Sequence, residues 1–190
     1  MRIVARFMND HGFRAVCLYR WGHYFFEKNL RILARLCQHL MLHTAHCSIS
    51  VAARIGPGLT VRHVGDIVVG GRSVIGSRFD IRQGVTIGGN TGKQVDGRSQ
   101  PLIGDDVRVG AGAKILGPVR IGNGVIVGAN SVVVSDVPDE AVVVGIPARV
   151  IRRGSTPVSA LDRDDPIARK VRELTQRVEH LEAILRTTPE

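Results

Sequence analysis

Branched aliphatic residues recur every six positions through the middle of the chain, with glycine or polar residues between them. The series is clearest from Ile103, where the chain reads IGDDVR, VGAGAK, ILGPVR, IGNGVI and VGANSV. It is interrupted by a two-residue slip, which the pattern places at 67–68, and by an insertion at 88–102. About thirteen aliphatic positions share this register: Ile49, Ile55, Val61, Val69, Ile75, Ile81, Ile87, Ile103, Val109, Ile115, Ile121, Val127 and Val133.

A period of six does not match the 3.6-residue repeat of a helix, and glycine in helix interiors costs about 1 kcal/mol each. Short strands joined by glycine-containing corners explain the pattern, with one aliphatic residue of each hexad pointing inward. A single repeat buries little surface, so neighbouring repeats must stack to form a continuous core. The pattern therefore predicts an all-β solenoid over residues 48–151, with the segment 88–102 projecting as an arm.

The two ends of the chain read as helical. Residues 1–47 carry an apolar stripe that predicts a helical segment, formed by Leu30, Leu33, Cys37, Leu40 and Met41. This segment is interpreted as a cap on the first coil, or as an interfacial helix that makes peripheral contact with the inner membrane. After a linker at 152–165, the segment 166–187 has the 4, 3, 4, 3, 4 spacing of a coiled-coil helix, set by Ile167, Val171, Leu174, Val178, Leu181 and Leu185.

Composition supports this architecture and excludes several functions. Of the 22 glycines, 19 lie between Gly56 and Gly145, and aromatic residues make up only 4% of the chain. The net charge of +9 is concentrated at 1–47 and 148–163, without the aromatic interleaving of an RNA-binding groove. We therefore expect no nucleic-acid partner and no transmembrane helix. The three cysteines show no metal-ligand spacing, which predicts a cytoplasmic protein without disulfides or a metal site.

The hexads resemble those of the left-handed parallel β-helix acyltransferases, and three hexads would form one triangular coil. The stretches IGPGLTVRH, VTIGGNTGK, VGANSVVVSDVP and VGIPARVI are similar to the serine O-acetyltransferase branch, which includes exopolysaccharide and capsule O-acetyltransferases. This resemblance implies a left-handed β-helix, acetyl-CoA as the donor, and a homotrimer with active sites between subunits.

Acetyl transfer to a hydroxyl needs a base for the hydroxyl proton and a donor for the oxyanion. Histidine suits the base role, and His63 stands where the catalytic histidine of the resembled family falls. A main-chain N–H near Gly89, at the base of the arm, is the candidate oxyanion donor. The alternative interpretations are an exposed corner histidine and an ordinary surface loop.

The resemblance places coenzyme A along the later coils. Family contacts to the pantetheine arm map to Ala111 and Ala129, although the solenoid itself also needs small residues at its corners. Arg149, Arg152 and Arg153 follow the last coil and are candidates for the nucleotide phosphates, with a solvated basic cluster as the alternative.

Several residues depart from the pattern of serine-specific members. Arg62 replaces the acidic residue before the catalytic histidine, Ser48 replaces the orienting aspartate, and no histidine lies between 64 and 179. Asp66 is a candidate substitute for orienting His63, and Arg62 would suit an anionic or hydroxyl-rich acceptor. The sequence thus favours a sugar or polysaccharide intermediate as the acceptor. A serine O-acetyltransferase with a rearranged pocket and a non-catalytic trimeric scaffold remain as alternatives.

Overall fold

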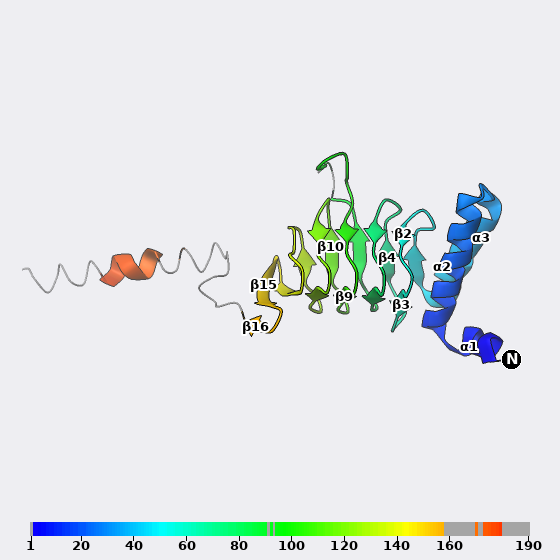
Figure 1. Cartoon of the computed structure of the whole chain (residues 1–190), viewed down its shortest axis with the longest axis horizontal. Coiled ribbons are helices and arrows are strands. Elements are labelled where there is room, and N and C mark those ends of the chain that lie inside the picture. The colour runs from blue at the N-terminus through cyan, green and yellow to red at the C-terminus, as the bar shows by residue number, and fades with distance from the viewer. Residues whose placement is uncertain (1, 91, 93, 158–169, 171–172, 180–190) are drawn as a thin grey trace, which may run out of the picture.

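The protein is a parallel β-solenoid with helices packed against its N-terminal end and a loop that projects from its side (Figure 1). The computed structural model describes residues 2–90, 92, 94–157, 170 and 173–179. Two- and three-residue strands follow one another around a triangular path, as the six-residue period predicts. The expectation of a β-solenoid with an N-terminal helical part is confirmed.

The solenoid has three sheets, one on each face. The first contains β1 (Cys47–Ile49), β4 (Ile67–Val69), β7 (Thr86–Gly88), β10 (Lys114–Leu116) and β13 (Val132–Val133). The second contains β2 (Arg54–Ile55), β5 (Val74–Ile75), β8 (Leu102–Ile103) and β11 (Arg120–Ile121). The third contains β3 (Thr60–Val61), β6 (Asp80–Ile81), β9 (Arg108–Val109), β12 (Ile126–Val127) and β14 (Ala141–Gly145), and is closed by the antiparallel strands β15 (Ala148–Arg153) and β16 (Thr156–Pro157).

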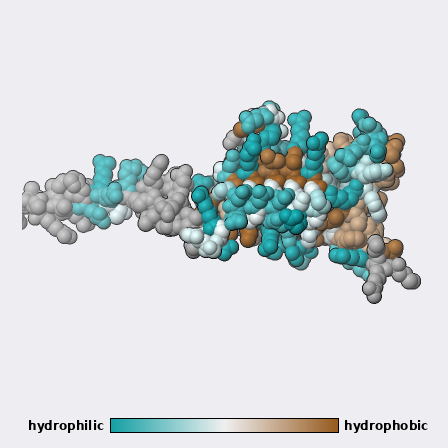
Figure 2. Space-filling view, viewed as in Figure 1, coloured by the Kyte–Doolittle hydropathy of each residue, from teal (hydrophilic) through white to brown (hydrophobic). Residues whose placement is uncertain are grey.

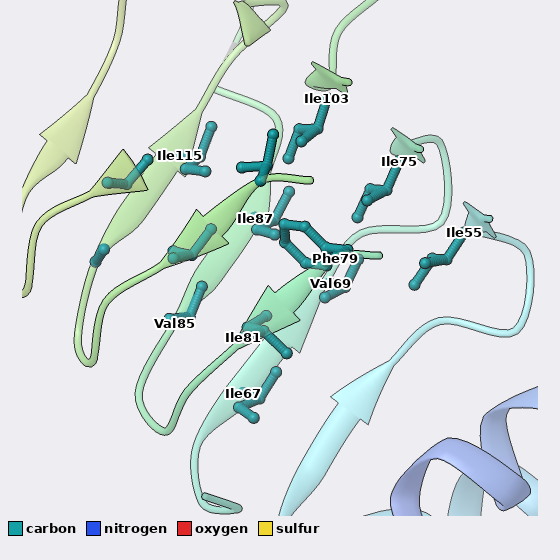
Figure 3. Close-up of a cluster of buried hydrophobic side chains, with 14 of the residues drawn as sticks. Ile55, Ile67, Val69, Ile75, Phe79, Ile81, Val85, Ile87, Ile103 and Ile115 are labelled. Atoms are coloured by element: carbon teal, nitrogen blue, oxygen red, sulfur yellow. The ribbon is translucent and has the colours of Figure 1, made fainter. Parts of the chain in front are cut away.

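The core is a column of aliphatic side chains that runs along the solenoid axis (Figure 3). All thirteen inward positions named by the hexad register are buried, with exposed fractions of 0–7%. A second inward set, which includes Val85, Val107 and Ala113, fills the corners. Phe79 is the one aromatic residue of the sequence between 48 and 157, and it too is fully buried in this column.

The two-residue slip lies at a different place from that predicted by the hexad pattern. Arg62 N donates to Ile81 O (3.1 Å), which continues the 20-residue offset of the pair Val61 and Ile81. Gly84 N donates to Gly65 O (2.8 Å), and β4 pairs with β7 at an offset of 18. The two extra residues are therefore His63 and Val64, in the corner after β3, rather than residues 67–68. The pattern could not locate them because any point between the two aliphatic registers satisfies it equally.

A longer interruption separates β7 from β8. Thr86 pairs with Lys114, 28 positions later, whereas neighbouring coils pair at 18, so ten extra residues leave the solenoid here. Val95 and Arg98 form an isolated antiparallel bridge within this arm. At its base, Gln100 Oε1 accepts hydrogen bonds from Arg72 N (3.0 Å) and Ser73 Oγ (3.1 Å), which fix the returning chain to the coil above.

The helices α2 (His11–Glu27) and α3 (Arg31–Ala45) cover the first coil, and α1 (Arg2–Asn9) packs against α2. Some main-chain N–H groups donate to carbonyl groups of the next coil, as Arg54 N does to Ser73 O, so the matching carbonyl groups of the first coil have no preceding coil to donate to them. Side chains of α2 fill this role: Tyr19 Oη donates to Ala53 O (2.9 Å), and Arg20 Nη1 donates to Ile55 O (2.6 Å). The helical segment thus satisfies and protects an open edge, which supports its interpretation as a cap.

The buried face of α3 differs from the predicted stripe. Ala34, Cys37, Met41 and Ala45 are buried, whereas Leu30, Leu33 and Leu40 are 41–48% exposed. The reason is a close approach of the helices, because a Cβ on Gly22 of α2 would lie 3.1 Å from Cys37 Cβ. The small residues Ala34 and Cys37 lie at this contact, and the exposed leucines leave apolar surface at the helical end of the molecule (Figure 2).

The predicted coiled-coil segment 166–187 falls largely outside the described residues. Of this segment the structure describes residues 170 and 173–179, which are helical. Among the described helices, none is both long and apolar enough to cross a membrane.

Candidate active site

His63 is one of the two extra residues of the first coil, which pair with no residue of the next coil along the chain. The chain leaves β3 in register, bulges outward at His63 and Val64, and returns through Gly65 and Asp66, whose φ angles are +117° and +52°. This bulge leaves the His63 side chain exposed. It makes no hydrogen bond or ion pair with any other residue that the structure describes. The imidazole is therefore presented to the surface, as a general base must be to reach a substrate hydroxyl.

A pocket of about 460 Å³ lies beside His63, between the first turn of α2 and β3. Gly12 brings the two elements together, because a Cβ at this position would collide with the Val61 carbonyl oxygen. The charged and polar residues that line the pocket are Arg6, Asp10, Thr60, Arg62 and His63. The helical cap thus contributes two ionisable side chains to the surroundings of His63.

Arg62 is held by a carboxylate from the coil below. Its Nε donates to Asp80 Oδ2 at 2.6 Å, and the side chain of Asp80 is only 12% exposed whereas that of Arg62 is 56% exposed. Asp80 lies opposite Thr60 in the β3–β6 pair, directly under the strand that carries Arg62. The terminal NH₂ groups of the guanidinium make no hydrogen bond to any described residue, so they are open to a ligand.

Asp10 caps α2 at the other wall of the pocket. Its Oδ1 accepts from Phe13 N (2.9 Å), and its Oδ2 lies 3.4 Å from Arg6 Nε. The Phe13 N–H, chiefly, and the Arg6 guanidinium hold the pKa of this carboxyl below its usual range, so Asp10 is ionised at neutral pH. A Cβ on Gly12 would lie 3.4 Å from Asp10 Oδ1, which places the carboxylate beside the main chain of Val61.

Asp66, the candidate for orienting His63, is exposed and in the left-handed conformation. Within the described chain no hydrogen bond or ion pair links it to His63. Its role as an orienting residue stays a prediction.

The candidate pantetheine residues share one corner of the solenoid. Asn130 N donates to Ala111 O (2.8 Å) and Gly112 N donates to Gln83 O (2.9 Å), so Gln83, Ala111 and Ala129 stack on successive coils. Gly110 is packed so tightly that a Cβ would lie 2.6 Å from Ala129 N. On the coil that precedes Gln83, the same corner position is occupied by Gly65, next to the His63 bulge. A ligand that runs along the corner would therefore meet small side chains and lead toward His63.

Gly89 begins the arm and is exposed. A Cβ at Gly89 would lie 3.0 Å from Ser99 O, so the outgoing and returning chains of the arm lie against each other here. The candidate phosphate-binding residues lie elsewhere: Arg152 and Arg153 are exposed on β15, and Arg149 is half-buried with its Nη1 3.2 Å from Ala148 O. Strands β6, β9, β12 and β14 separate β15 from β3, a distance of about 24 Å at the usual strand spacing.

Comparison with known proteins gives one consistent family. Residues 101–135 match the model of the bacterial transferase hexapeptide (six repeats). The chain is 42% identical to the serine acetyltransferase of Synechococcus elongatus over 174 residues, which cover 90% of this chain and 70% of that protein. It is 36% identical to the serine acetyltransferase of Bacillus pumilus, over 92% of this chain and 81% of that protein. The chain belongs to the serine acetyltransferase family.

Solved structures agree with this assignment. The serine acetyltransferase of Brucella abortus superposes with a TM-score of 0.70 at 32% identity, over 83% of this chain and 67% of that one. A serine acetyltransferase in complex with CoA superposes with a TM-score of 0.67 at 40% identity, over 74% of this chain and 57% of that one. The expected left-handed β-helix is confirmed, and this family member is an acyltransferase that uses acetyl-CoA.

Two residues that line or support the pocket were missed by the sequence analysis. Asp10 has a local signal, since an aspartate before a helix is a typical N-cap, but nothing in the sequence indicates that this cap faces His63. Asp80 has no signal, because its contact with Arg62 depends on the 20-residue offset created by the bulge. No group of three or more potential metal ligands occurs among the described residues.

Proposed function

We propose that this protein transfers the acetyl group of acetyl-CoA to the hydroxyl of L-serine, with His63 as the general base. The observation that carries this proposal is the position of His63, exposed on a bulge beside a polar pocket, in a chain 42% identical to a serine acetyltransferase. The relatives favour serine over the sugar acceptor that the sequence departures suggest.

In the proposed reaction, an imidazole nitrogen of His63 accepts the hydroxyl proton as the oxygen attacks the thioester carbonyl carbon. The new C–O bond gives a tetrahedral oxyanion, and a main-chain N–H near Gly89 is the proposed donor to it. The C–S bond then breaks, and the departing thiolate takes the proton from the imidazolium. The products are O-acetylserine and coenzyme A, and His63 returns to its neutral form.

The coenzyme is proposed to lie along the corner of Ala111 and Ala129. Small side chains there permit close approach to main-chain groups, and Arg149, Arg152 and Arg153 would meet the phosphates at the far end. In this arrangement the arm of one subunit covers the His63 corner of the next, which is why we propose a homotrimer with shared active sites. The single chain supports this assembly by leaving His63 open to solvent.

A sugar hydroxyl is the second candidate acceptor, favoured by one observation. Arg62 replaces the acidic residue expected before the histidine of serine-specific members, and its Nε is held by Asp80 Oδ2 at 2.6 Å. A sugar that bears a carboxylate or phosphate would use this cation. A location near the inner membrane would fit such an acceptor and belongs to this second candidate.

Thiol release from acetyl-CoA, measured with L-serine and with a panel of nucleotide sugars and oligosaccharides, separates these functions. The proposal predicts saturable turnover with L-serine and O-acetylserine as the product. Turnover restricted to a sugar would refute the serine assignment in favour of the second candidate. Absence of turnover with every acceptor would refute both and leave the trimeric scaffold.

A further inference from the structure

The pocket beside His63 contains charges of both signs, and its helical wall supplies the cation Arg6 as well as the anion Asp10. Arg62 comes from the strand side and Asp10 from the helical cap, and both line the same cavity of about 460 Å³. Free serine carries a carboxylate and an ammonium on the carbon next to its hydroxymethyl group. A site for it therefore needs a cation and an anion within a few ångströms of the base.

Arg62 is suited to the carboxylate. Because its Nε is bonded to Asp80, the guanidinium has a fixed orientation while its two terminal NH₂ groups stay open. A planar guanidinium binds a carboxylate through two parallel hydrogen bonds, which position as well as attract it. Asp80 is mostly buried and serves as a positioning residue for Arg62.

Asp10 is suited to the ammonium. Its Oδ1 accepts from Phe13 N and its Oδ2 from Arg6 Nε, with the Gly12 N–H also acting on the carboxylate, and the two oxygens together retain capacity for a further donor. The Arg6 contact is long, at 3.4 Å, and its two side chains are 65% and 44% exposed, so it competes weakly with a bound ammonium.

We propose that Asp10 and Arg62 form an amino-acid-binding site in which Asp10 binds the ammonium and Arg62 the carboxylate of L-serine, so that its hydroxyl faces His63. This inference rests on the proposed serine acetyltransferase function and explains how serine binds although the acidic residue before His63 is absent. It also gives the N-terminus of α2 a role in substrate recognition beyond capping the first coil.

The test compares L-serine with two acceptors that each lack one charge: L-serinamide, without the carboxylate, and 3-hydroxypropanoate, without the ammonium. Asp10→Asn keeps the N-cap, since asparagine caps helices about as well as aspartate. Arg62→Gln is made alone and together with Asp80→Asn, so that no buried carboxylate is left unpaired. Asp106→Asn and Arg54→Gln, on exposed residues that do not line this pocket, are the matched controls.

We expect Asp10→Asn to raise KM at least about tenfold for L-serine and L-serinamide but not for 3-hydroxypropanoate. Both Arg62 variants should raise KM by a similar factor for L-serine and 3-hydroxypropanoate but not for L-serinamide. In the Asp10 and Arg62 variants, the KM for acetyl-CoA should stay within about twofold of wild type. In the control variants, the KM values for all three acceptors should do the same.

Serine turnover with an unchanged KM in the Asp10 and Arg62 variants would overturn this inference alone. A uniform loss with all three acceptors would also overturn it, because it would indicate structural damage rather than lost recognition of one charge. Failure of the wild-type protein to acetylate L-serine, with turnover of a sugar, would instead overturn the proposed function on which the inference rests.

Discussion

Gly12 lies at a close approach between the helical cap and the strand that precedes His63. A Cβ there would collide with the carbonyl oxygen of Val61, a main-chain atom that cannot move aside by rotating a side chain. Because Val61 directly precedes Arg62 and His63, this one contact sets both the distance of α2 from the solenoid and the width of the pocket.

Gly12→Ala should therefore lower the free energy of unfolding by about 1–3 kcal/mol, as overpacking does. This loss would exceed the gain in helix propensity of about 1 kcal/mol from replacing glycine by alanine. Urea denaturation followed by circular dichroism measures the change. Gly88→Ala, where a Cβ would meet nothing within 4 Å, is the control. A Gly12→Ala protein as stable as wild type would contradict the close approach.

Residues whose role follows from the repeat could be predicted, and residues whose role follows from the fold could not. The inward position of Ile81 or Val109 is set by a period of six, which is visible in the letters. The pairing of Arg62 with Asp80 depends on a bulge of two residues, which the period leaves unplaced. Asp10 reaches the site only because α2 packs across the first coil.

At the scale of elements, α2 completes the solenoid by bonding to carbonyl groups that have no preceding coil. Tyr19 is fully buried, and its hydroxyl lies 2.9 Å from Ala53 O. The sequence predicted helical structure here, but Leu30, Leu33 and Leu40 of the apolar stripe are exposed, and the small residues Ala34 and Cys37 lie on the buried face of α3 that packs near Gly22. Hydrophobicity alone does not report how near two helices lie.

Tyr19→Phe tests the role of α2 at this edge. The change removes only the hydroxyl, leaves the ring in place and deprives a main-chain carbonyl of its donor, so it should cost about 0.5–1.5 kcal/mol of unfolding free energy. The same urea titration measures it, with Tyr24→Phe, an exposed tyrosine of the same helix, as the control. Equal stability of the Tyr19→Phe and wild-type proteins would show that this hydrogen bond does not hold the cap.

The arm is a second element with a definable anchor. Gln100 bonds to Arg72 N and Ser73 Oγ, and removing its side chain should free the returning chain near Arg98. We expect Gln100→Ala to be cut by trypsin after Arg98 several times faster than wild type, because a released loop is a better protease substrate. Mass spectrometry of timed digests identifies the cut. Gln94→Ala, on an exposed residue of the arm, should digest at the wild-type rate.

At the scale of the whole molecule, the single chain holds His63, the pocket and the corner of Ala111 and Ala129, but leaves the base open to solvent. A neighbouring subunit would cover it in the proposed trimer. Light scattering coupled to size exclusion should therefore give a mass near three times the 20.6 kDa of one chain. A stable monomer at micromolar concentration would contradict an active site shared between subunits.

The fold class could thus be anticipated from the hexads, and the donor from the resemblance that they carry, whereas the role of His63 as the base stays a prediction. The acceptor could not be anticipated, because its recognition falls to residues from separate parts of the chain. Sequence departures at Arg62 and Ser48 pointed toward a sugar, whereas the family relationship and the presence of both Asp10 and Arg62 in the pocket favour an amino acid.

The most direct test of this account is the rate of O-acetylserine formation by wild-type and His63→Ala protein, followed by mass spectrometry at saturating acetyl-CoA. The account predicts saturable wild-type turnover and a loss of about 10²–10⁴-fold in kcat on replacing His63. Thermal stability should be unchanged, since His63 is exposed and contributes no hydrogen bond within the described chain. His43→Ala, on the cap helix α3, should retain wild-type turnover. Equal rates of O-acetylserine formation by the His63→Ala and wild-type proteins would contradict the role of His63 as the general base.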